Sequence, residues 1–216
     1  MTITWLGHAC FKIQDKNVRI ITDPYDPSIG LKLPRLAADI VTVSHDHYDH
    51  NNIGAIRGVN GEPFVIKNPG EYELKGVFIY GLPSWHDKSE GKERGTNTIY
   101  RIEMEDISLV HLGDLGHILN EDQIKILEGV DILCIPVGGV YTINAKEAAE
   151  VISQLEPRIV IPMHYKIPGL KINIDPIDKF AREMGVSVKE KLPKLKVSQK
   201  DLPQEETKII ILECAH

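Results

Sequence analysis

A histidine-rich run at residues 44–50 constrains this chain more than any other feature. Its sequence, Ser-His-Asp-His-Tyr-Asp-His, places three imidazoles and two carboxylates in six consecutive positions directly after an apolar, strand-like segment. On extended backbone His45 and His47 point to the same side and can bind one metal ion. If the backbone then turns into a helix, Asp49 and His50 can face a second ion, roughly 3.5–4 Å from the first in two-metal hydrolytic sites. A solvated polar turn is the alternative, and it leaves this density of ligand-type side chains unexplained.

The spacing His-x-His-x-Asp-His resembles the signature of the metallo-β-lactamase superfamily, and the resemblance extends over nearly the whole chain. Members of that superfamily take three further ligands from later strand ends, in the order His, Asp, His. His86, Asp114 and His164 match that order, and each follows an apolar strand-like segment. The resemblance implies a first metal site formed by His45, His47 and His86, a second formed by Asp49, His50 and His164, and Asp114 shared between the two.

Within this superfamily the chain resembles the branch of small cytoplasmic hydrolases related to L-ascorbate-6-phosphate lactonase and, more distantly, to N-acyl phosphatidylethanolamine phospholipase D. The segments that carry this likeness are residues 5–8, 21–24, 111–117, 136–142 and 161–165, with the sequences WLGH, ITDP, HLGDLGH, PVGGVYT and IPMHY. A shared fold hosts many chemistries, so the branch limits the type of reaction more than it limits the substrate.

A single domain over residues 1–216 is expected. A chain of 216 residues can bury a substantial core, and no Pro-, Gly- or Ser-rich spacer, internal repeat or low-complexity tract marks a boundary. The N-terminus has no basic stretch followed by an apolar core, and no run of about 18 apolar residues occurs. We therefore expect a soluble, cytoplasmic protein without a membrane span.

The three cysteines, Cys10, Cys134 and Cys214, are widely spaced and odd in number, which argues against a disulfide framework. We expect them to act as small core residues, as unpaired cysteines usually do. The ligand set that the resemblance implies contains no cysteine, whereas exported zinc β-lactamases generally use one. Antibiotic hydrolysis is therefore a poor fit.

The length and spacing of the apolar segments predict more strands than helices. Strand-like runs occupy residues 3–6, 10–13, 18–22, 40–44, 64–66, 77–80, 98–102, 107–112, 132–137, 159–163 and 208–212. Helices are expected after Asn120 through residue 128, after Asn144 through residue 155, and from Asp175-Pro176 through residue 184. This order suits an α/β (α+β) protein in which helices cover two packed sheets. The resemblance independently implies the four-layer αβ/βα sandwich of the metallo-β-lactamase fold.

The resemblance and the ligand chemistry together predict a metal-dependent hydrolase. Two divalent ions lower the pKa of a shared water to about 7, so that a bridging hydroxide can attack the ester, lactone or phosphodiester of a small molecule. Asp49 is expected both to bind metal and to orient that hydroxide. Zinc is the default for His and Asp ligands, but manganese, iron and nickel fit the same residues. No Gly-x-Ser-x-Gly elbow supports a serine hydrolase.

Four further residues are candidates for supporting roles. Asp23 ends an apolar strand and precedes proline, so it either fixes the tautomer of a ligand histidine, as the resemblance implies, or forms an ordinary turn. His8 either faces the cleft or is a satisfied histidine at a sheet end. His117 follows the shared aspartate by three residues and is a candidate acid for the leaving group, or else a loop histidine. Tyr141, after a Gly-Gly pair, can reach a developing oxyanion or pack as a loop tyrosine.

Other polar residues near the proposed ligands are interpreted as structural. His111 lies inside an apolar strand and is expected in the core, while Asp46 and Asp87 should point away from the site because side chains alternate along extended backbone. The mixed-charge run 88–94 directly follows His86 and is interpreted as a solvated loop that can cover the cleft.

Charge and ligand identity weigh against two other enzyme classes. A formal net charge of −6 gives no overall attraction for polyanions, although a basic patch in residues 189–196 keeps a metal-dependent nuclease as an alternative. A non-haem iron redox enzyme, similar to the sulfur dioxygenases of the superfamily, is the second alternative. The di-iron reductases of the superfamily have Glu where this chain has His47, which weighs against that class. A small-molecule substrate is the expected partner. The oligomeric state, a homo-oligomer included, is left open.

Overall fold

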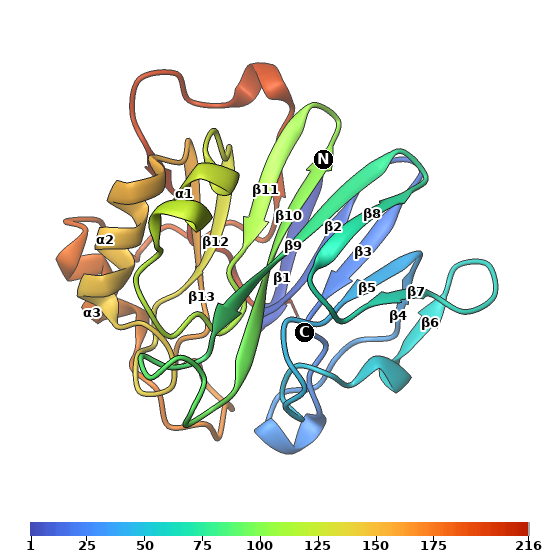
Figure 1. Ribbon diagram of the computed structural model, residues 1–216, viewed down its shortest axis with the longest axis horizontal. Helices are drawn as coiled ribbons and strands as arrows, with labels where there is room; N and C mark the ends of the chain where they lie inside the picture. Colours follow the sequence, from blue (N-terminus) through green and yellow to red (C-terminus); the bar gives the residue numbers. More distant parts are fainter. Residues whose placement is uncertain (216) are drawn as a thin grey trace.

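The computed structural model describes residues 1–215, and two β-sheets form its centre (Figure 1). The first sheet contains, in order, β14 (Leu195–Lys196), β1 (Thr2–Gly7), β2 (Cys10–Gln14), β3 (Arg19–Thr22), β5 (Ile40–Thr42) and β7 (Phe64–Ile66). The second contains β15 (Lys208–Ile209), β13 (Ile159–Met163), β12 (Ile132–Pro136), β11 (Ile107–His111), β10 (Thr96–Met104), β9 (Val77–Trp85) and β8 (Gly70–Leu74). A separate pair consists of β4 (Leu36–Ala38) and β6 (Ile56–Gly58).

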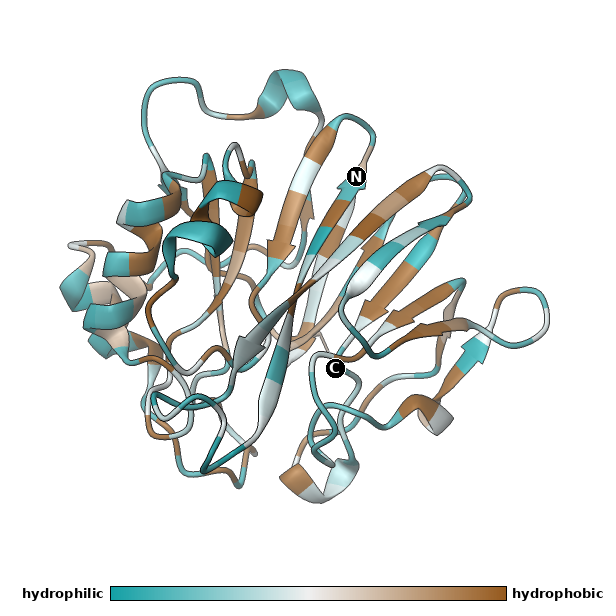
Figure 2. Cartoon of the chain, viewed as in Figure 1, coloured by the Kyte–Doolittle hydropathy of each residue, from teal (hydrophilic) through white to brown (hydrophobic). Residues whose placement is uncertain are grey.

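One apolar core joins the two sheets. Trp5 and Phe11 of the first sheet belong to the same buried cluster as Ile99 and Leu109 of the second. Strands β11, β12 and β13 are buried along their whole length, as parallel strands are when both faces of a sheet are covered. Figure 2 shows apolar residues along these strands, and hydrophilic residues on the outer surface of the helices and on the loops.

Three α-helices lie beside β12 and β13: α1 (Glu121–Leu127), α2 (Ala145–Leu155) and α3 (Ile177–Glu183) (Figure 1). Asn120 and Asn144 cap α1 and α2 through capping boxes. In each box the side chains of the cap and of the residue three positions later accept hydrogen bonds from each other's backbone N–H groups. The α2 face that contains Val151 and Leu155 is buried. All three helices expected from the sequence are therefore confirmed.

The outer face of the six-stranded sheet carries a second apolar cluster, which includes Leu6, Ile21, Tyr25 and Val41. Its covering layer also contributes Ile29 from a 3-10 turn, Leu36 from β4, Ile56 from β6, and Leu170 and Ile174 from a later loop. The two-sheet α/β architecture agrees with the expected metallo-β-lactamase fold. On this side, however, the covering layer consists of loops and short strands where an α-helical layer was expected. These loops have no helical periodicity, so nothing in the sequence indicates that they cover a sheet.

The strand directions bring the proposed site residues to one edge of the sandwich. Strands β11, β12 and β13 are parallel to one another, and so are β3, β5 and β7. Because β10 is antiparallel to both β9 and β11, these two strands also end at the same edge, which is the lower edge in Figure 1. Asp23 follows β3, residues 45–50 follow β5, His86 follows β9, Asp114 follows β11 and His164 follows β13. Carboxyl ends of parallel strands are a common place for active sites.

All eleven strand-like runs of the sequence contain a strand, with boundaries shifted by a few residues. The sequence missed β4, β6, β8 and β14. Strand β8 lies at the edge of its sheet and exposes Glu71 and Glu73, so it has no apolar stripe to detect, and the other three are only two or three residues long. Within residues 1–215, no helix is long and apolar enough to cross a membrane.

Candidate metal centre

The three histidines expected at the first metal site lie together. One ring nitrogen each of His45, His47 and His86 lies within 4.8 Å of the others, and the ring centroids are 4.5–5.2 Å apart. His45 and His86 are buried, whereas His47 is exposed and borders a cavity. The His-x-His pair after β5 and the histidine after β9 thus converge from two different sheets.

Asp114 lies between the two expected ligand sets. Its Oδ2 atom is 3.3 Å from Nε2 of His50, 3.3 Å from Nε2 of His86 and 3.2 Å from Nε2 of His164. The side chain is buried, and its Oδ1 atom has no hydrogen-bond partner within residues 1–215. One carboxylate oxygen therefore faces histidines of both sets, as a ligand shared by two ions would.

His8 contacts every residue of the second set. Its Nε2 atom is 3.2 Å from Oδ2 of Asp49, and its ring centroid is 4.8 Å from that of His50 and 4.3 Å from that of His164. The His8 carbonyl also accepts hydrogen bonds from His164 N at 3.0 Å and from Trp5 Nε1 at 2.9 Å. Of the two interpretations of His8, the structure therefore favours the one in which it belongs to the site.

Asp23 sets the tautomers of two histidines. Its Oδ2 atom lies 2.9 Å from Nδ1 of His50 and accepts a 2.6 Å hydrogen bond from the Ser44 hydroxyl. Because that hydroxyl donates to Asp23, its oxygen can accept from Nδ1–H of His45, which lies 2.9 Å away. Both rings then direct Nε2 to the site, where it is the nitrogen available to a metal ion. Ser44 was not assigned a role from the sequence; its position between a strand and the first histidine was the only available signal.

Three residues of the site adopt left-handed backbone conformations, with φ of 53° at His8, 40° at Asp23 and 52° at His164. Such conformations cost non-glycine residues of order 1–3 kcal/mol each and persist where the surrounding contacts determine them. Asp23 N donates to Thr42 O at 2.8 Å, and His164 N donates to the His8 carbonyl. These bonds hold the backbone turns that direct the side chains toward one another.

Burial and neighbouring charges prepare the side chains for cations. Burial, with the nearby His50, holds the pKa of His45 well below its ordinary value, so that this ring is neutral near pH 7. Burial would raise the pKa of Asp114, but His164 and His50 outweigh it and hold that pKa well below its usual range. Burial would lower the pKa of His50, but the Asp114 and Asp23 carboxylates raise it. The carboxylates thus favour positive charge here, from a proton or from a metal ion that replaces it.

The donor set fits divalent metal ions. Nε2 of His45 and Oδ1 of Asp114 are buried without hydrogen-bond partners in the described part of the chain. Buried polar atoms are normally satisfied, so two orphaned ligand-type atoms in one cluster indicate a missing partner. Imidazole nitrogen and carboxylate oxygen suit zinc and its divalent neighbours.

A cavity of about 750 Å3 opens beside this cluster. It is lined by Asp46, His47, Tyr48, Asp49, His86, Arg94, Asp114, Tyr141, His164, Lys171, Ile172 and Asn173. The cavity places Tyr141 beside five of the proposed metal ligands. Asp46 also borders it, contrary to the expected outward position, although its carboxylate accepts a 2.5 Å hydrogen bond from Asn51.

His117 is not among the residues that line this cavity. Its Nε2 atom accepts a 3.2 Å hydrogen bond from Trp85 N, and its Nδ1 atom lies 2.8 Å from Ile118 O. Both ring nitrogens therefore bond to backbone, which corresponds to the loop-histidine alternative. His111 is buried, with Nε2 at 2.8 Å from Ala9 O, in the core position expected for it.

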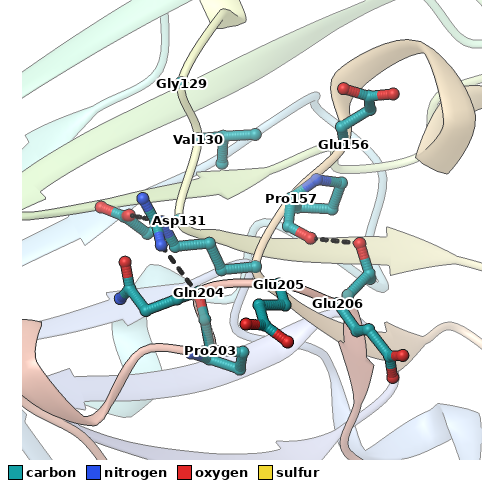
Figure 3. A pocket seen from close by; sticks show the side chains of 11 residues that line it. Gly129, Val130, Asp131, Glu156, Pro157, Pro203, Gln204, Glu205 and Glu206 are labelled. Atoms are coloured by element: carbon teal, nitrogen blue, oxygen red, sulfur yellow. Dashed lines mark hydrogen bonds and ion pairs between the residues drawn. The ribbon is translucent and has the colours of Figure 1, made fainter.

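A second cavity, of about 490 Å3, lies between residues 129–131, 156–158 and 203–207 (Figure 3). None of the proposed ligands lines it. Its one guanidinium, that of Arg158, is already bonded to Pro203 O at 2.8 Å and lies 3.3 Å from Asp131 Oδ1. The cavity beside the histidine cluster is therefore the candidate substrate site.

Residues 2–164 match the model of the β-lactamase superfamily domain. The chain is 32% identical to a UPF0173 metal-dependent hydrolase of Thermococcus onnurineus, over 76% of this chain and 84% of that protein. It is 30% identical to a UPF0173 metal-dependent hydrolase of Pyrococcus horikoshii, over 85% of this chain and 92% of that protein.

The fold is also similar to the crystal structure of a proposed zinc-dependent hydrolase of the metallo-β-lactamase superfamily from Thermotoga maritima. That similarity has a TM-score of 0.76 at 35% sequence identity and covers 98% of this chain and 99% of the other. Together with the clustered His and Asp side chains, these matches show that the chain belongs to the metallo-β-lactamase superfamily and is one of its metal-dependent hydrolases.

Proposed function

We propose that the protein uses two divalent ions, zinc by default, to hydrolyse an ester, lactone or phosphodiester bond of a small molecule. The observation that carries this proposal is the position of Asp114 Oδ2, at 3.2–3.3 Å from ring nitrogens of both ligand sets. His45, His47 and His86 would hold one ion, Asp49, His50 and His164 the other, and Asp114 would contact both. Bound divalent ions would supply an acidified water with a pKa near 7 and a positive field for the developing negative charge.

Asp49 would orient the attacking water. Burial opposes its charge, but the hydrogen bond from His8 and the nearby His50 hold the pKa of Asp49 below its usual range, so it is a carboxylate near neutral pH. Its side chain is partly exposed to the cavity and can accept a hydrogen bond there. His8 is a positioning residue in this account, because its ring fixes the Asp49 carboxylate at 3.2 Å and is itself fully buried.

Tyr141 is our candidate donor to the substrate oxygen on which negative charge develops. Its hydroxyl belongs to a side chain that borders the cavity and is 39% exposed, so it can reach a bound substrate. We leave His117 out of the mechanism because both of its nitrogens bond to backbone. A cavity of about 750 Å3 suits a small molecule, and we propose a cytoplasmic substrate of that size.

Hydrolysis assays on protein reconstituted with zinc or manganese test this proposal. Bis-p-nitrophenyl phosphate, p-nitrophenyl acetate and simple lactones cover the three bond types. We expect at least one class to be hydrolysed, with activity removed by a chelator, restored by metal and lost in Asp114→Ala. Asp46→Asn is the matched control, because this carboxylate lies in the same ligand-bearing loop but bonds Asn51.

Activity that survives both chelation and Asp114→Ala would contradict the proposal. Iron retained at about one equivalent, with oxygen consumption and no hydrolysis, would favour the redox alternative instead. Cleavage confined to nucleic acid would favour the nuclease.

A further inference from the structure

Two positively charged side chains, Arg94 and Lys171, border the cavity beside the metal cluster. Among the residues that the structure describes, no other lysine or arginine lines it, and the two residues are 77 positions apart in the sequence. We propose, on the basis of the hydrolytic function above, that these two cations bind an anionic group of the substrate, a carboxylate or a phosphate, away from the bond that is cleaved.

The loop that presents Arg94 is fixed by a buried carboxylate. Asp87 accepts hydrogen bonds from four backbone amides of this loop, those of Ser89, Gly91, Glu93 and Arg94, at 2.8–3.1 Å. Gly91 has a φ of 76°, and a Cβ atom there would lie only 2.8 Å from Gly95 O and 2.9 Å from Trp85 Cε3. The run 88–94, interpreted from the sequence as a solvated loop, is thus a tight turn with a defined shape.

The Arg94 guanidinium is available to a ligand. Among residues 1–215 its nearest carboxylate oxygen is Oε2 of Glu93 at 3.7 Å, and the Glu93 side chain is 60% exposed, so solvent weakens this pair. The guanidinium carbon lies 5.6 Å from the centroid of the Tyr141 ring. A cation held over an aromatic face keeps its outward N–H donors free, and the planar guanidinium matches carboxylate and phosphate oxygens in pairs.

Lys171 is presented by a second fixed loop. Lys171 N donates to Ile29 O at 2.7 Å, and the Lys166 ammonium donates to Leu170 O at 2.5 Å and to Ile172 O at 2.8 Å, on either side of Lys171. The Lys171 side-chain stem passes over Gly30, where a Cβ atom would lie 3.0 Å from Lys171 Cγ. Within residues 1–215 no carboxylate lies within 4.0 Å of the Lys171 ammonium, so its charge is unpaired in the protein.

The balance of charge in the cavity also favours an anion. Three carboxylates border it, but Asp49 and Asp114 belong to the metal centre and Asp46 is bonded to Asn51. With two divalent ions bound, the cavity as a whole is positive, and a concave site of one sign concentrates ligands of the opposite sign. The chain as a whole carries a formal charge of −6, so this attraction is local and suits a small anion better than a polyanion.

Binding of two matched anilides, whose amide is none of the three bond types proposed for cleavage, tests the inference without requiring hydrolysis. N-(4-nitrophenyl)succinamic acid carries a carboxylate remote from its amide, and 4-nitroacetanilide is its neutral counterpart. We expect zinc-loaded protein to bind the acid roughly tenfold or more tightly than the neutral anilide in titration calorimetry, and this preference to fall roughly tenfold in Arg94→Gln/Lys171→Gln. The corresponding phosphonate, titrated in parallel, identifies which anion is preferred.

The double variant Arg57→Gln/Lys67→Gln is the control, because both side chains are exposed and neither borders the cavity. It should keep the wild-type preference. Equal binding of the acid and the neutral anilide by wild type would overturn the inference, and so would an unchanged preference in the Arg94/Lys171 variant, which would assign anion binding to the metal ions alone.

The esters p-nitrophenyl acetate and mono-p-nitrophenyl succinate separate this inference from the proposed function. Failure to cleave either ester, with the anilide preference intact, would count against these esters as substrates but not against the anion site. Cleavage of both esters with equal kcat/KM, together with equal anilide binding, would overturn the anion site and leave hydrolysis standing.

Discussion

Replacing Asp23 by asparagine should weaken metal binding while the chain stays folded. Asp23 lies 2.9 Å from Nδ1 of His50 and accepts hydrogen bonds from the Ser44 hydroxyl at 2.6 Å and from Ser44 N at 2.8 Å. Asparagine has almost the same shape and tolerates the left-handed φ of 40° about as well as aspartate does, so the backbone should not be strained. It has only one acceptor oxygen and no charge, so at least one of these bonds is lost.

The magnitude follows from the bond to His50. A hydrogen bond to a charged group contributes about 1.5–3 kcal/mol, which corresponds to roughly 10–100-fold in an equilibrium constant. Removing the partner that orients a ligand histidine costs a similar factor in metal affinity. We therefore expect the zinc affinity of Asp23→Asn to fall roughly 10–100-fold, because His50 and, through Ser44, His45 lose their fixed tautomers.

A competition titration of metal-free protein against a chelating dye at pH 7.5 measures this affinity, and circular dichroism checks the fold. Asp39→Asn is the control, since Asp39 is another largely buried carboxylate, bonded to Arg19 N and to Lys75 and remote from the cavity. It should change zinc affinity by less than about threefold, as expected for an independent site. A folded Asp23→Asn protein with the zinc affinity of the wild type would refute the reasoning.

Three further substitutions test other parts of the site. Burial lowers the pKa of His8 to about 4, below its unfolded value of 6.5, so its contribution to stability is present above pH 6.5 and is lost as the pH falls. Urea unfolding of the metal-free protein should therefore show the difference between wild type and His8→Gln shrinking by about 2 kcal/mol from pH 7 to pH 5, and a constant difference would contradict this. In Gly138→Ala the new Cβ atom would lie 2.1 Å from His164 O, and thermal unfolding should show a loss of about 1–3 kcal/mol; an unchanged Tm would count against the tight approach. Tyr141→Phe keeps the ring beneath Arg94 but removes the hydroxyl, so kcat should fall roughly tenfold or more at unchanged metal content, and an unaltered kcat would exclude Tyr141 as a donor.

The clustering of the candidate ligands could be predicted because its signal is local in the sequence. His45 and His47 are two positions apart, and the later candidates each follow an apolar strand that ends at the same edge of a sheet. Strand ends are visible in a single sequence as the end of an apolar run, and short parallel strands bring them together. The helices that begin after Asn120 and Asn144 were predictable for the same reason, because their capping boxes lie within four residues.

Long-range placement could not be predicted. Arg94 and Lys171 border one cavity, and Asp87 and Lys166 shape the loops that carry them through hydrogen bonds to backbone, which leave no pattern in the sequence. His117 is of a residue type common in catalysis, but both of its ring nitrogens contact backbone, and those contacts could not be foreseen from the sequence. The left-handed turn at His8 was equally unpredictable, because few non-glycine residues adopt it and the enrichment of histidine among them does not single out one position.

Metal stoichiometry tests the central claim, that one centre holds two ions with Asp114 between them. Elemental analysis of purified protein, dialysed after reconstitution with zinc, should give roughly two equivalents per chain for wild type and for Asp46→Asn, and clearly less for Asp114→Ala. One equivalent or none in the wild type, or a full complement of metal in Asp114→Ala, would contradict the account.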